Sequence, residues 1–160
     1  MQLSTKGRYA VMAMVDLAKH AHRGAAMPLV EIAEGQSLPI SYLEQLFMKL
    51  RRAGLVTAVR GPRGGYRLAR PAGEISIAEI MLAADESVRM TRCADDGTEL
   101  CIAGKRCETH DLWKALGDHI GGFLSVISLQ HVLDGSFADA LTAARIHMTK
   151  AAPKAKVAAS

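Results

Sequence analysis

Aromatic residues are scarce in this chain, and it has no apolar run long enough to cross a membrane. Only 4% of its 160 residues are aromatic although 49% are hydrophobic, so aliphatic side chains must build the core, which favours helices. A spanning helix needs about 18 apolar residues. The apolar stretch near the N-terminus is interrupted by Asp16, and no signal-peptide cleavage site follows it. We therefore expect a mainly helical, cytoplasmic protein with no membrane partner.

Acidic residues are missing from one segment, residues 49–70. It contains seven basic residues, which are Lys49, Arg51, Arg52, Arg60, Arg63, Arg67 and Arg70. Residues 74–101 have the opposite balance, with seven acids against two arginines. A local cluster of one sign favours a partner of the other sign, so the basic segment predicts contact with a polyanion such as nucleic acid.

Cysteine is also rare, and its placement is uneven. The three cysteines, Cys93, Cys101 and Cys107, are followed by His110, with seven, five and two residues between successive members. In a reducing compartment such a group indicates a metal site more often than a disulfide. The closely spaced cysteine pairs of zinc knuckles are absent, so an iron-sulfur cluster is favoured over zinc. Zinc remains an alternative metal for this site. His110 has an alternative role as an ordinary surface residue.

Apolar spacing predicts three helices in the first third of the chain. The first begins at Ser4 or Thr5 and runs to about Ala21, and a short one covers residues 30–34. The third has a stripe formed by Leu43, Leu46, Phe47 and Leu50, and it ends before Gly54. Two helices joined by a tight turn, the second with a basic end, are typical of a helix-turn-helix.

A β-hairpin is predicted next, because LVTAV and YRLAR flank the turn RGPRGG. A hairpin directly after a helix-turn-helix is the wing of a winged-helix domain. Ser76 and Glu79 have the spacing of a capping box for a short helix to about Ala84.

A long helix is expected after the cysteines, from Thr109 as N-cap to about Ser128. Its apolar seam consists of Leu112, Leu116, Ile120, Phe123 and Ile127. Such a seam predicts a homodimer through the same helix of a second copy. Short helices are expected at 129–133 and 137–146. The predicted organisation is a winged helix-turn-helix domain at 1–84, a cluster-binding loop at 85–108, a dimerisation helix with short C-terminal helices at 109–147, and a disordered tail at 148–160.

The third helix would lie in a DNA major groove with Ser41, Glu44 and Gln45 facing base edges. The alternative for Ser41 and Glu44 is a capping box that serves only the helix. Arg60 and Arg63, at the hairpin tip, would enter a minor groove or contact phosphate, and their alternative is a solvated turn. Further DNA-contact candidates are Lys6, Arg8, Tyr42, Lys49 and Arg52.

Enzymatic activity is not expected, because no nucleophile lies in a recognisable pattern with a base and no acid/base pair is evident. A protein that only carries or stores a cluster is the rival class. It would explain the cysteines but would leave the basic wing without a purpose.

Several motifs in combination identify a resemblance over about residues 1–133. LSTKGRYAV, SYLEQLF, GLVTAVRGPRGGYRL, DESV with the following TRC, and CETHDLW resemble the IscR family of iron-sulfur cluster regulators, winged-helix repressors grouped with NsrR and RirA. The resemblance implies a homodimeric cytoplasmic transcription factor that binds a double-stranded operator and represses cluster-assembly genes.

The resemblance also implies specific residues. It assigns a 2Fe-2S cluster to Cys93, Cys101, Cys107 and His110, with the cluster-assembly machinery as donor. It assigns base reading to Ser41, Glu44 and Gln45, and a minor-groove contact to Arg60. The seven-residue spacer after Cys93 is longer than in the best-known IscR pattern and is similar to RirA. An iron- or nitric-oxide-responsive repressor with a 4Fe-4S cluster therefore stays open.

Overall fold

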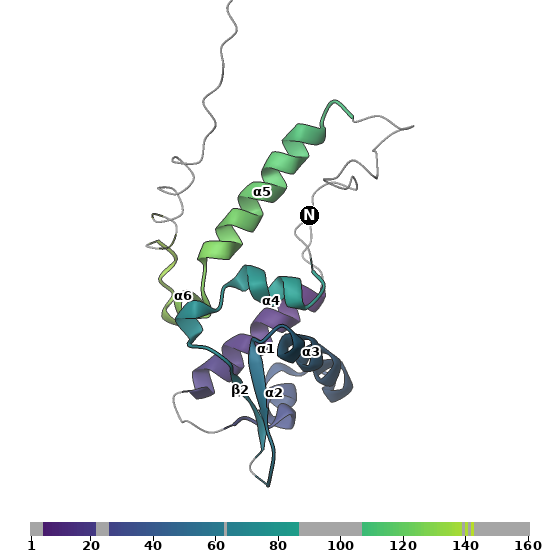
Figure 1. The fold of residues 1–160 in the computed structure, drawn as a ribbon, viewed down its shortest axis with the longest axis vertical. Coiled ribbons are helices and arrows are strands. Elements are labelled where there is room, and N and C mark those ends of the chain that lie inside the picture. The colour runs from purple at the N-terminus through teal and green to yellow at the C-terminus, as the bar shows by residue number, and fades with distance from the viewer. Residues whose placement is uncertain are drawn as a thin grey trace, which may run out of the picture.

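The fold is an elongated arrangement in which one long helix rises from a helical body that carries a small hairpin (Figure 1). The computed structural model describes residues 5–21, 26–62, 64–86, 107–138, 140 and 142. Its elements, in chain order, are α1 (Thr5–Ala21), α2 (Leu29–Gln36), α3 (Ile40–Arg52), β1 (Val56–Val59), β2 (Gly65–Leu68), the 3-10 turn η1 (Ala72–Glu74), α4 (Ile77–Ala83), α5 (His110–Val126) and α6 (Leu129–Asp134).

The core lies where α1, α2, α3 and α4 meet. The stripe predicted for the third helix is buried there, with Phe47 and Leu43 fully enclosed. Tyr66 of β2 packs its ring against Phe47 with centroids 4.8 Å apart, so the hairpin is fixed to the back of α3. Burying aliphatic and aromatic carbon in this way stabilises the body by roughly 25 cal/mol per Å² of apolar surface removed from water.

The hairpin has the predicted antiparallel pairing, with Val56 opposite Leu68 and Val59 opposite Gly65. An isolated bridge between Met27 and Tyr66 joins it to the segment before α2. Gly65 is required at this crossing, because a Cβ atom there would collide with the backbone of Met27. The segment before α2 thus holds the wing at the start of β2, and the tip extends beyond the body (Figure 1).

Helix starts decide one of the alternatives left open by the sequence. The N-cap position of α3 is Pro39, and no side chain forms a cap hydrogen bond. The capping box considered for Ser41 and Glu44 is therefore wrong, since both residues lie inside the helix. In contrast, the capping box of Ser76 and Glu79 at the start of α4 is confirmed, with both reciprocal hydrogen bonds present.

Two expectations for the long helix need correction. Thr109 occupies the N-cap position of α5, but its side chain makes no cap hydrogen bond. The helix ends at Val126, because Ile127 leaves it in an extended conformation. The Ile127 carbonyl accepts a hydrogen bond from the N–H of Ile77, the first residue of α4, at 2.8 Å, and this pairing competes with another turn of α5.

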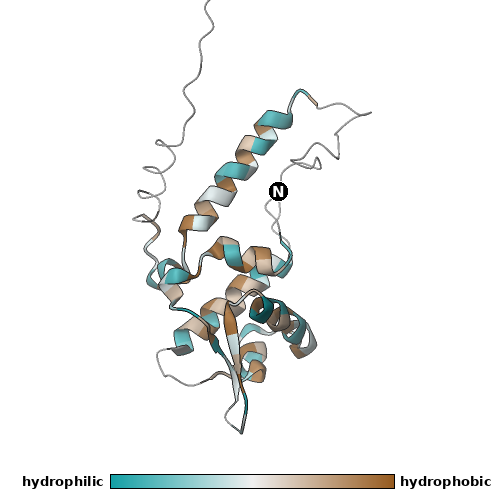
Figure 2. Cartoon of the chain, viewed as in Figure 1, coloured by the Kyte–Doolittle hydropathy of each residue, from teal (hydrophilic) through white to brown (hydrophobic). Residues whose placement is uncertain are grey.

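Hydrophobic residues recur along α5 (Figure 2), and several of their side chains are exposed. The exposed fractions of Leu112, Trp113 and Leu116 are 63%, 43% and 36%. The helix contacts α4 near its base and extends away from the body beyond that point (Figure 1). None of the described helices combines the length and apolar character that crossing a membrane requires. The predicted disordered tail at 148–160 lies outside the described residues, and so does part of the helix expected at 137–146.

Candidate nucleic-acid interface and metal-ligand site

The outer side of α3 presents the predicted base-reading residues. Ser41, Glu44 and Gln45 are exposed, while the stripe on the other side of the helix is buried. The amphipathic spacing causes this arrangement, because a helix that buries one face must turn the opposite face to solvent. These three side chains occupy the first turns of α3, where a recognition helix meets base edges.

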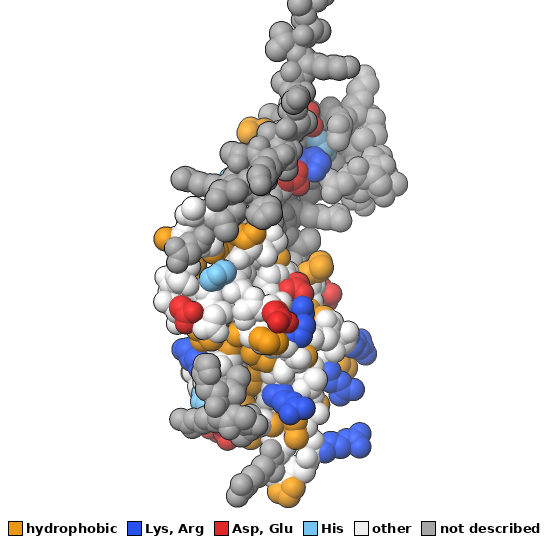
Figure 3. Space-filling view, turned by 60° about the vertical axis from the view of Figure 1, so that its left-hand side comes forward, with side chains coloured by type: hydrophobic (Ala, Val, Ile, Leu, Met, Phe, Trp, Pro, Cys, Tyr) orange, Lys and Arg blue, Asp and Glu red, His pale blue; other side chains and the backbone are white. Residues whose placement is uncertain are grey.

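The basic side chains have different surroundings. Arg60, directly after β1, is exposed at the wing tip, and Arg52 is exposed in the last turn of α3. Arg8 is exposed on α1. Arg63 lies outside the described residues. Figure 3 shows Lys and Arg side chains along one edge of the body, below the more neutral region near its centre.

One member of the basic segment has a structural role. Arg70 donates a hydrogen bond from Nη2 to Glu79 Oε1 at 2.7 Å and another to the Glu74 carbonyl. The hydrogen bond from Arg70 to the Glu79 carboxylate, together with one from the Ser76 N–H, lowers the pKa of Glu79 below its usual value. Burial opposes this shift with a smaller effect. The sequence pattern could not separate such an arginine from the exposed ones.

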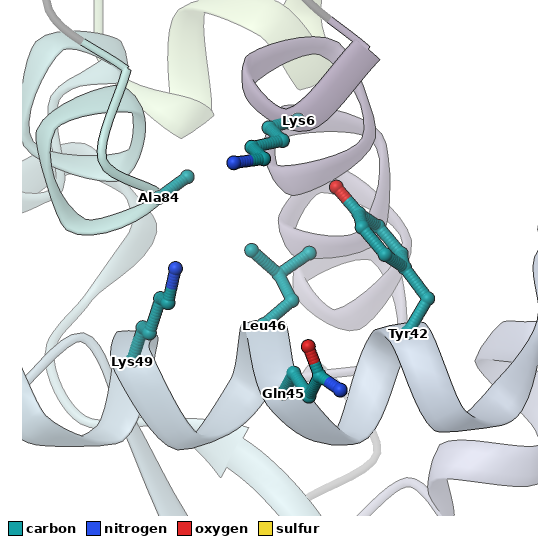
Figure 4. Close-up of a pocket in the computed structure, with 6 residues that line it drawn as sticks. All are labelled: Lys6, Tyr42, Gln45, Leu46, Lys49 and Ala84. Atoms are coloured by element: carbon teal, nitrogen blue, oxygen red, sulfur yellow. The ribbon is translucent and has the colours of Figure 1, made fainter.

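Four of the predicted DNA-contact residues meet in one pocket, which we call the lysine pocket (Figure 4). Lys6 enters it from α1 and Lys49 from α3, with both amino groups pointing into the space between the helices. Tyr42 and Gln45 of α3 also line it. The remaining lining residues are Leu46 and Ala84. The lining residues thus carry two ammonium groups, a hydroxyl and a carboxamide, a set suited to an anion.

The Tyr42 ring is held in place by an edge contact with Tyr9, with centroids 5.9 Å apart. Burial raises the pKa of Tyr42 above its usual value, while the nearby Lys49 lowers it by a smaller amount. The hydroxyl therefore stays protonated at neutral pH and can donate a hydrogen bond into the lysine pocket.

An acid that follows α4 pairs with one lysine of this pocket. Lys49 Nζ forms an ion pair with Asp85 Oδ2 at 2.5 Å, and this hydrogen bond lowers the pKa of Asp85. Asp85 has a left-handed backbone conformation with φ of 58°. The next residue, Glu86, packs against Gly7 of α1, where an added Cβ would lie 3.0 Å from Glu86 Cγ. Residues 85–107, which we call the Cys segment, thus begin in contact with α1 and α3.

Two predicted metal ligands, Cys107 and His110, lie at and just after the other end of the Cys segment. His110 is the first residue of α5 and only 2% exposed, so the alternative of a surface histidine is wrong. The backbone N–H of His110 donates a hydrogen bond to the Cys107 carbonyl at 3.1 Å. Cys107 is half-buried, and its Sγ lies 3.6 Å from Thr109 Oγ1, so this hydroxyl contacts the thiol and does not cap the helix.

One turn of chain therefore holds a thiol and a buried imidazole, donors that suit soft or borderline metals and iron-sulfur clusters. Cys93 and Cys101 lie outside the described residues, so the structure does not place the other two predicted ligands. Within the described part of the chain, no group of three or more possible ligands is assembled.

The sequence reasoning missed Asp85 and Thr109 as site residues. From the sequence, Asp85 is only one of the seven acids of residues 74–101, and Thr109 is only a helix cap. The position of Asp85 directly after a predicted helix was the available signal, because aspartate tolerates the left-handed conformation that ends many helices.

The chain was compared with known protein families and curated proteins. The model of the family described as Rrf2, iron-dependent transcriptional regulator, matches residues 3–135. The HTH-type transcriptional regulator IscR of Photorhabdus laumondii is 54% identical over 134 residues, which cover 84% of this chain and 80% of the relative. The protein with the same description from Serratia proteamaculans is 50% identical over 134 residues, with coverages of 84% and 80%.

Solved structures of similar proteins have the same architecture. T. potens IscR superposes with a TM-score of 0.68 at 35% identity, covering 85% of this chain and 88% of that one. CymR, the global cysteine regulator of B. subtilis, gives a TM-score of 0.70 at 29% identity, with coverages of 85% and 98%. The mainly helical winged fold predicted from the sequence is confirmed by these matches.

Proposed function

The chain belongs to the Rrf2 family of iron-dependent transcriptional regulators, and from this membership we propose that it senses iron-sulfur cluster status and represses cluster-assembly genes accordingly. It is a DNA-binding transcriptional regulator and not an enzyme. The finer proposal concerns what it binds, which residues bind it, and how a cluster changes the affinity for DNA. The observation that carries it is the exposed polar start of α3 beside the lysine pocket, with the Cys segment beginning at that pocket.

For the operator, we propose that α3 enters the major groove and the wing contacts the adjacent minor groove. Glu44 can accept a hydrogen bond from cytosine N4, and Gln45 can pair with adenine. The Ser41 hydroxyl can accept from a base donor or donate to a base acceptor. Arg60 suits a narrow minor groove, where the negative potential is high, and Arg63 is proposed beside it. Phosphate contacts are proposed for Lys6, Arg8, Tyr42, Lys49 and Arg52.

For the cofactor, we propose a 2Fe-2S cluster held by Cys93, Cys101, Cys107 and His110. Such a cluster, when bound, supplies an iron-dependent and redox-active group whose presence reports cluster supply. The buried position of His110 and its hydrogen bond to Cys107 support the fit, since both donors are fixed in one turn. The cluster-assembly machinery is the proposed donor. The proposed place of action is the cytoplasm, where the operator is.

The proposed assembly is a homodimer through α5. Leu112, Trp113 and Leu116 leave an apolar face on a helix that extends away from its own body (Figure 1). A second copy of the same helix covers this face in the simplest arrangement, and two recognition helices then meet two half-sites of one operator. We propose the same organisation as from the sequence, with a DNA-binding domain at 1–84, a cluster-binding loop at 85–108 and a dimerisation region at 109–147.

The coupling between cofactor and DNA is proposed to run through the two ends of the Cys segment. At one end, Asp85 pairs with Lys49 of α3, and at the other end Cys107 is followed by His110 at the start of α5. Ligation by all four residues would restrict the Cys segment and bias the position of Asp85. Cluster binding and operator binding must then change each other's affinity by the same factor.

The first experiment is visible absorption with iron and sulfide analysis of protein purified without oxygen. About two irons and two sulfides per chain support the proposal. A 4Fe-4S signature would favour the iron- or nitric-oxide-responsive alternative, and bound zinc without iron would overturn cluster sensing.

The ligand assignment has its own matched pair of variants. His110→Ala should lose cluster or alter its spectrum, whereas His119→Ala, an exposed histidine on the same helix, should not. Loaded wild-type protein and the Cys93→Ala/Cys101→Ala/Cys107→Ala variant should differ in affinity for at least one operator. Equal affinities at every operator would contradict cluster sensing. The protein would then be a simple cluster carrier or a regulator whose DNA binding does not depend on the cluster.

A further inference from the structure

We propose that Asp85 is an internal competitor of DNA phosphate: its carboxylate pairs with Lys49 at the lysine pocket, and operator binding displaces it. The inference rests on the proposed DNA contact by α1 and α3. It goes beyond that contact by naming a residue that weakens it and that lies at the start of the Cys segment.

The lysine pocket has the donors that a phosphodiester group needs. Lys6 and Lys49 supply two positive charges from different helices, and their amino groups point into the same space (Figure 4). Tyr42 supplies a protonated hydroxyl, and Gln45 supplies an amide. A phosphodiester carries one negative charge and accepts hydrogen bonds on its oxygens, so it matches this set. The pocket borders the exposed face of α3 that is proposed to enter the major groove.

Asp85 presents an anion to the same cation. One of its carboxylate oxygens contacts Lys49, and Lys6 adds a smaller attraction that also lowers the pKa of Asp85. A lysine that is paired with this carboxylate cannot give its full charge to a DNA phosphate. Phosphate binding at Lys49 therefore has to displace or share the Asp85 carboxylate.

The ion pair is suited to exchange. The Asp85 side chain is 69% exposed, and pairs at such positions contribute little because water competes with them. A deeply buried pair could not be broken by DNA at a low cost. The position nevertheless favours aspartate, since its left-handed backbone ends α4 and aspartate tolerates that conformation better than most residues.

The consequence reaches the cluster end of the protein. Asp85 and Glu86 are the first residues of the Cys segment, and both lie against α1 or α3. Displacing Asp85 from Lys49 removes one anchor of this segment. By reciprocity, any state of the Cys segment that holds Asp85 on Lys49 weakens operator binding, and any state that draws Asp85 away strengthens it.

The test measures DNA affinity of the full chain at equal cluster loading, using duplexes enriched from random sequence by the wild-type protein. Asp85→Asn and Asp85→Gly remove the carboxylate while keeping residues that accept a left-handed backbone. The matched control is Glu74→Gln, which makes the same charge change at an exposed site in η1. Lys49→Ala is combined with Asp85→Asn to complete a double-mutant cycle.

We expect both Asp85 variants to bind about twofold to fivefold more tightly than wild type, the range of an exposed ion pair. Glu74→Gln should change affinity by less. In the Lys49→Ala background, Asp85→Asn should have no further effect. Equal or weaker binding by both Asp85 variants, or the same gain without Lys49, would overturn the competition. Failure of wild type to enrich any duplex would instead overturn the proposed DNA contact itself.

Discussion

Ser76 and Ser128 face each other across an isolated antiparallel bridge, and each caps the helix that follows it. The Leu129 N–H donates a hydrogen bond to the Ile75 carbonyl at 2.9 Å, which closes the bridge from the other side. The two helix starts, of α4 and α6, are thereby joined. This short junction sets how α5 leaves the body, since α5 ends at Val126, two residues before Ser128.

Replacing Ser128 should weaken this junction. Its hydroxyl accepts a hydrogen bond from the His131 N–H, and its own N–H donates one to His131 Nδ1 at 3.1 Å. Ser128→Ala should lower the free energy of unfolding by about 1 kcal/mol, the usual contribution of a cap. This corresponds to a decrease of about 2–4 °C in Tm for a chain of this size. Calorimetry at a fixed protein concentration measures it. Ser125→Ala is the control, because it removes only an exposed hydrogen bond to the Gly122 carbonyl, and an equal loss there would contradict a special role of the junction.

The Glu79 carboxylate should make stability depend on pH in the acid range. Hydrogen bonds from Arg70 and Ser76 lower its pKa in the folded state, so it contributes stability that is fully present above its ordinary value of 4.5. That contribution is lost as pH falls through the lowered pKa, because the protonated carboxyl cannot accept from Arg70 as strongly. The urea midpoints of wild type and Glu79→Gln should therefore differ at pH 7 and converge below about pH 4. A difference that stays constant with pH would show that the ionised form is not the one stabilised.

Glu44→Ala should reduce sequence discrimination more than overall affinity. Losing one base-edge contact should cost about 1–3 kcal/mol of discrimination at a single base pair. The slope of log affinity against log salt should remain unchanged, because Glu44 neutralises no phosphate. Fluorescence anisotropy with an enriched duplex and its single-base variants measures both quantities. Arg52→Ala provides the contrast, with a uniform loss on all sequences and a slope reduced by about 1. A uniform loss for Glu44→Ala would contradict base reading.

Leu116→Glu on α5 should prevent dimerisation. A carboxylate placed without a partner in a covered apolar face costs about 3–5 kcal/mol. The dissociation constant of the dimer should therefore rise by at least about a hundredfold. Analytical ultracentrifugation over a concentration series measures it. The control is Asp118→Lys on the polar side of α5, which breaks the ion pair with Lys114 and leaves the apolar face unchanged. A dimer that persists in Leu116→Glu would place the interface elsewhere.

The sequence by itself determined the features that depend on neighbours in the chain. The stripe of α3, the hairpin and the capping box of Ser76 and Glu79 follow from spacings of two to seven residues, over which the backbone geometry of helices and turns is fixed. The pairing of Cys107 with His110 belongs to the same class, because both lie in one turn. The motifs carried the family resemblance, which the comparisons confirmed.

Tertiary structure alone decided which residues pair with partners that are distant in the sequence. Lys49 and Asp85 are 36 positions apart, and only the packing of α3 against α4 brings them together. The folded chain also buries His110 and pairs Arg70 with Glu79, although other arginines of the basic segment remain exposed. Contacts of this kind depend on the angles and distances between helices, which no local spacing specifies. The sequence therefore determined the elements and their chemistry, and the packing of those elements decided which charges are paired.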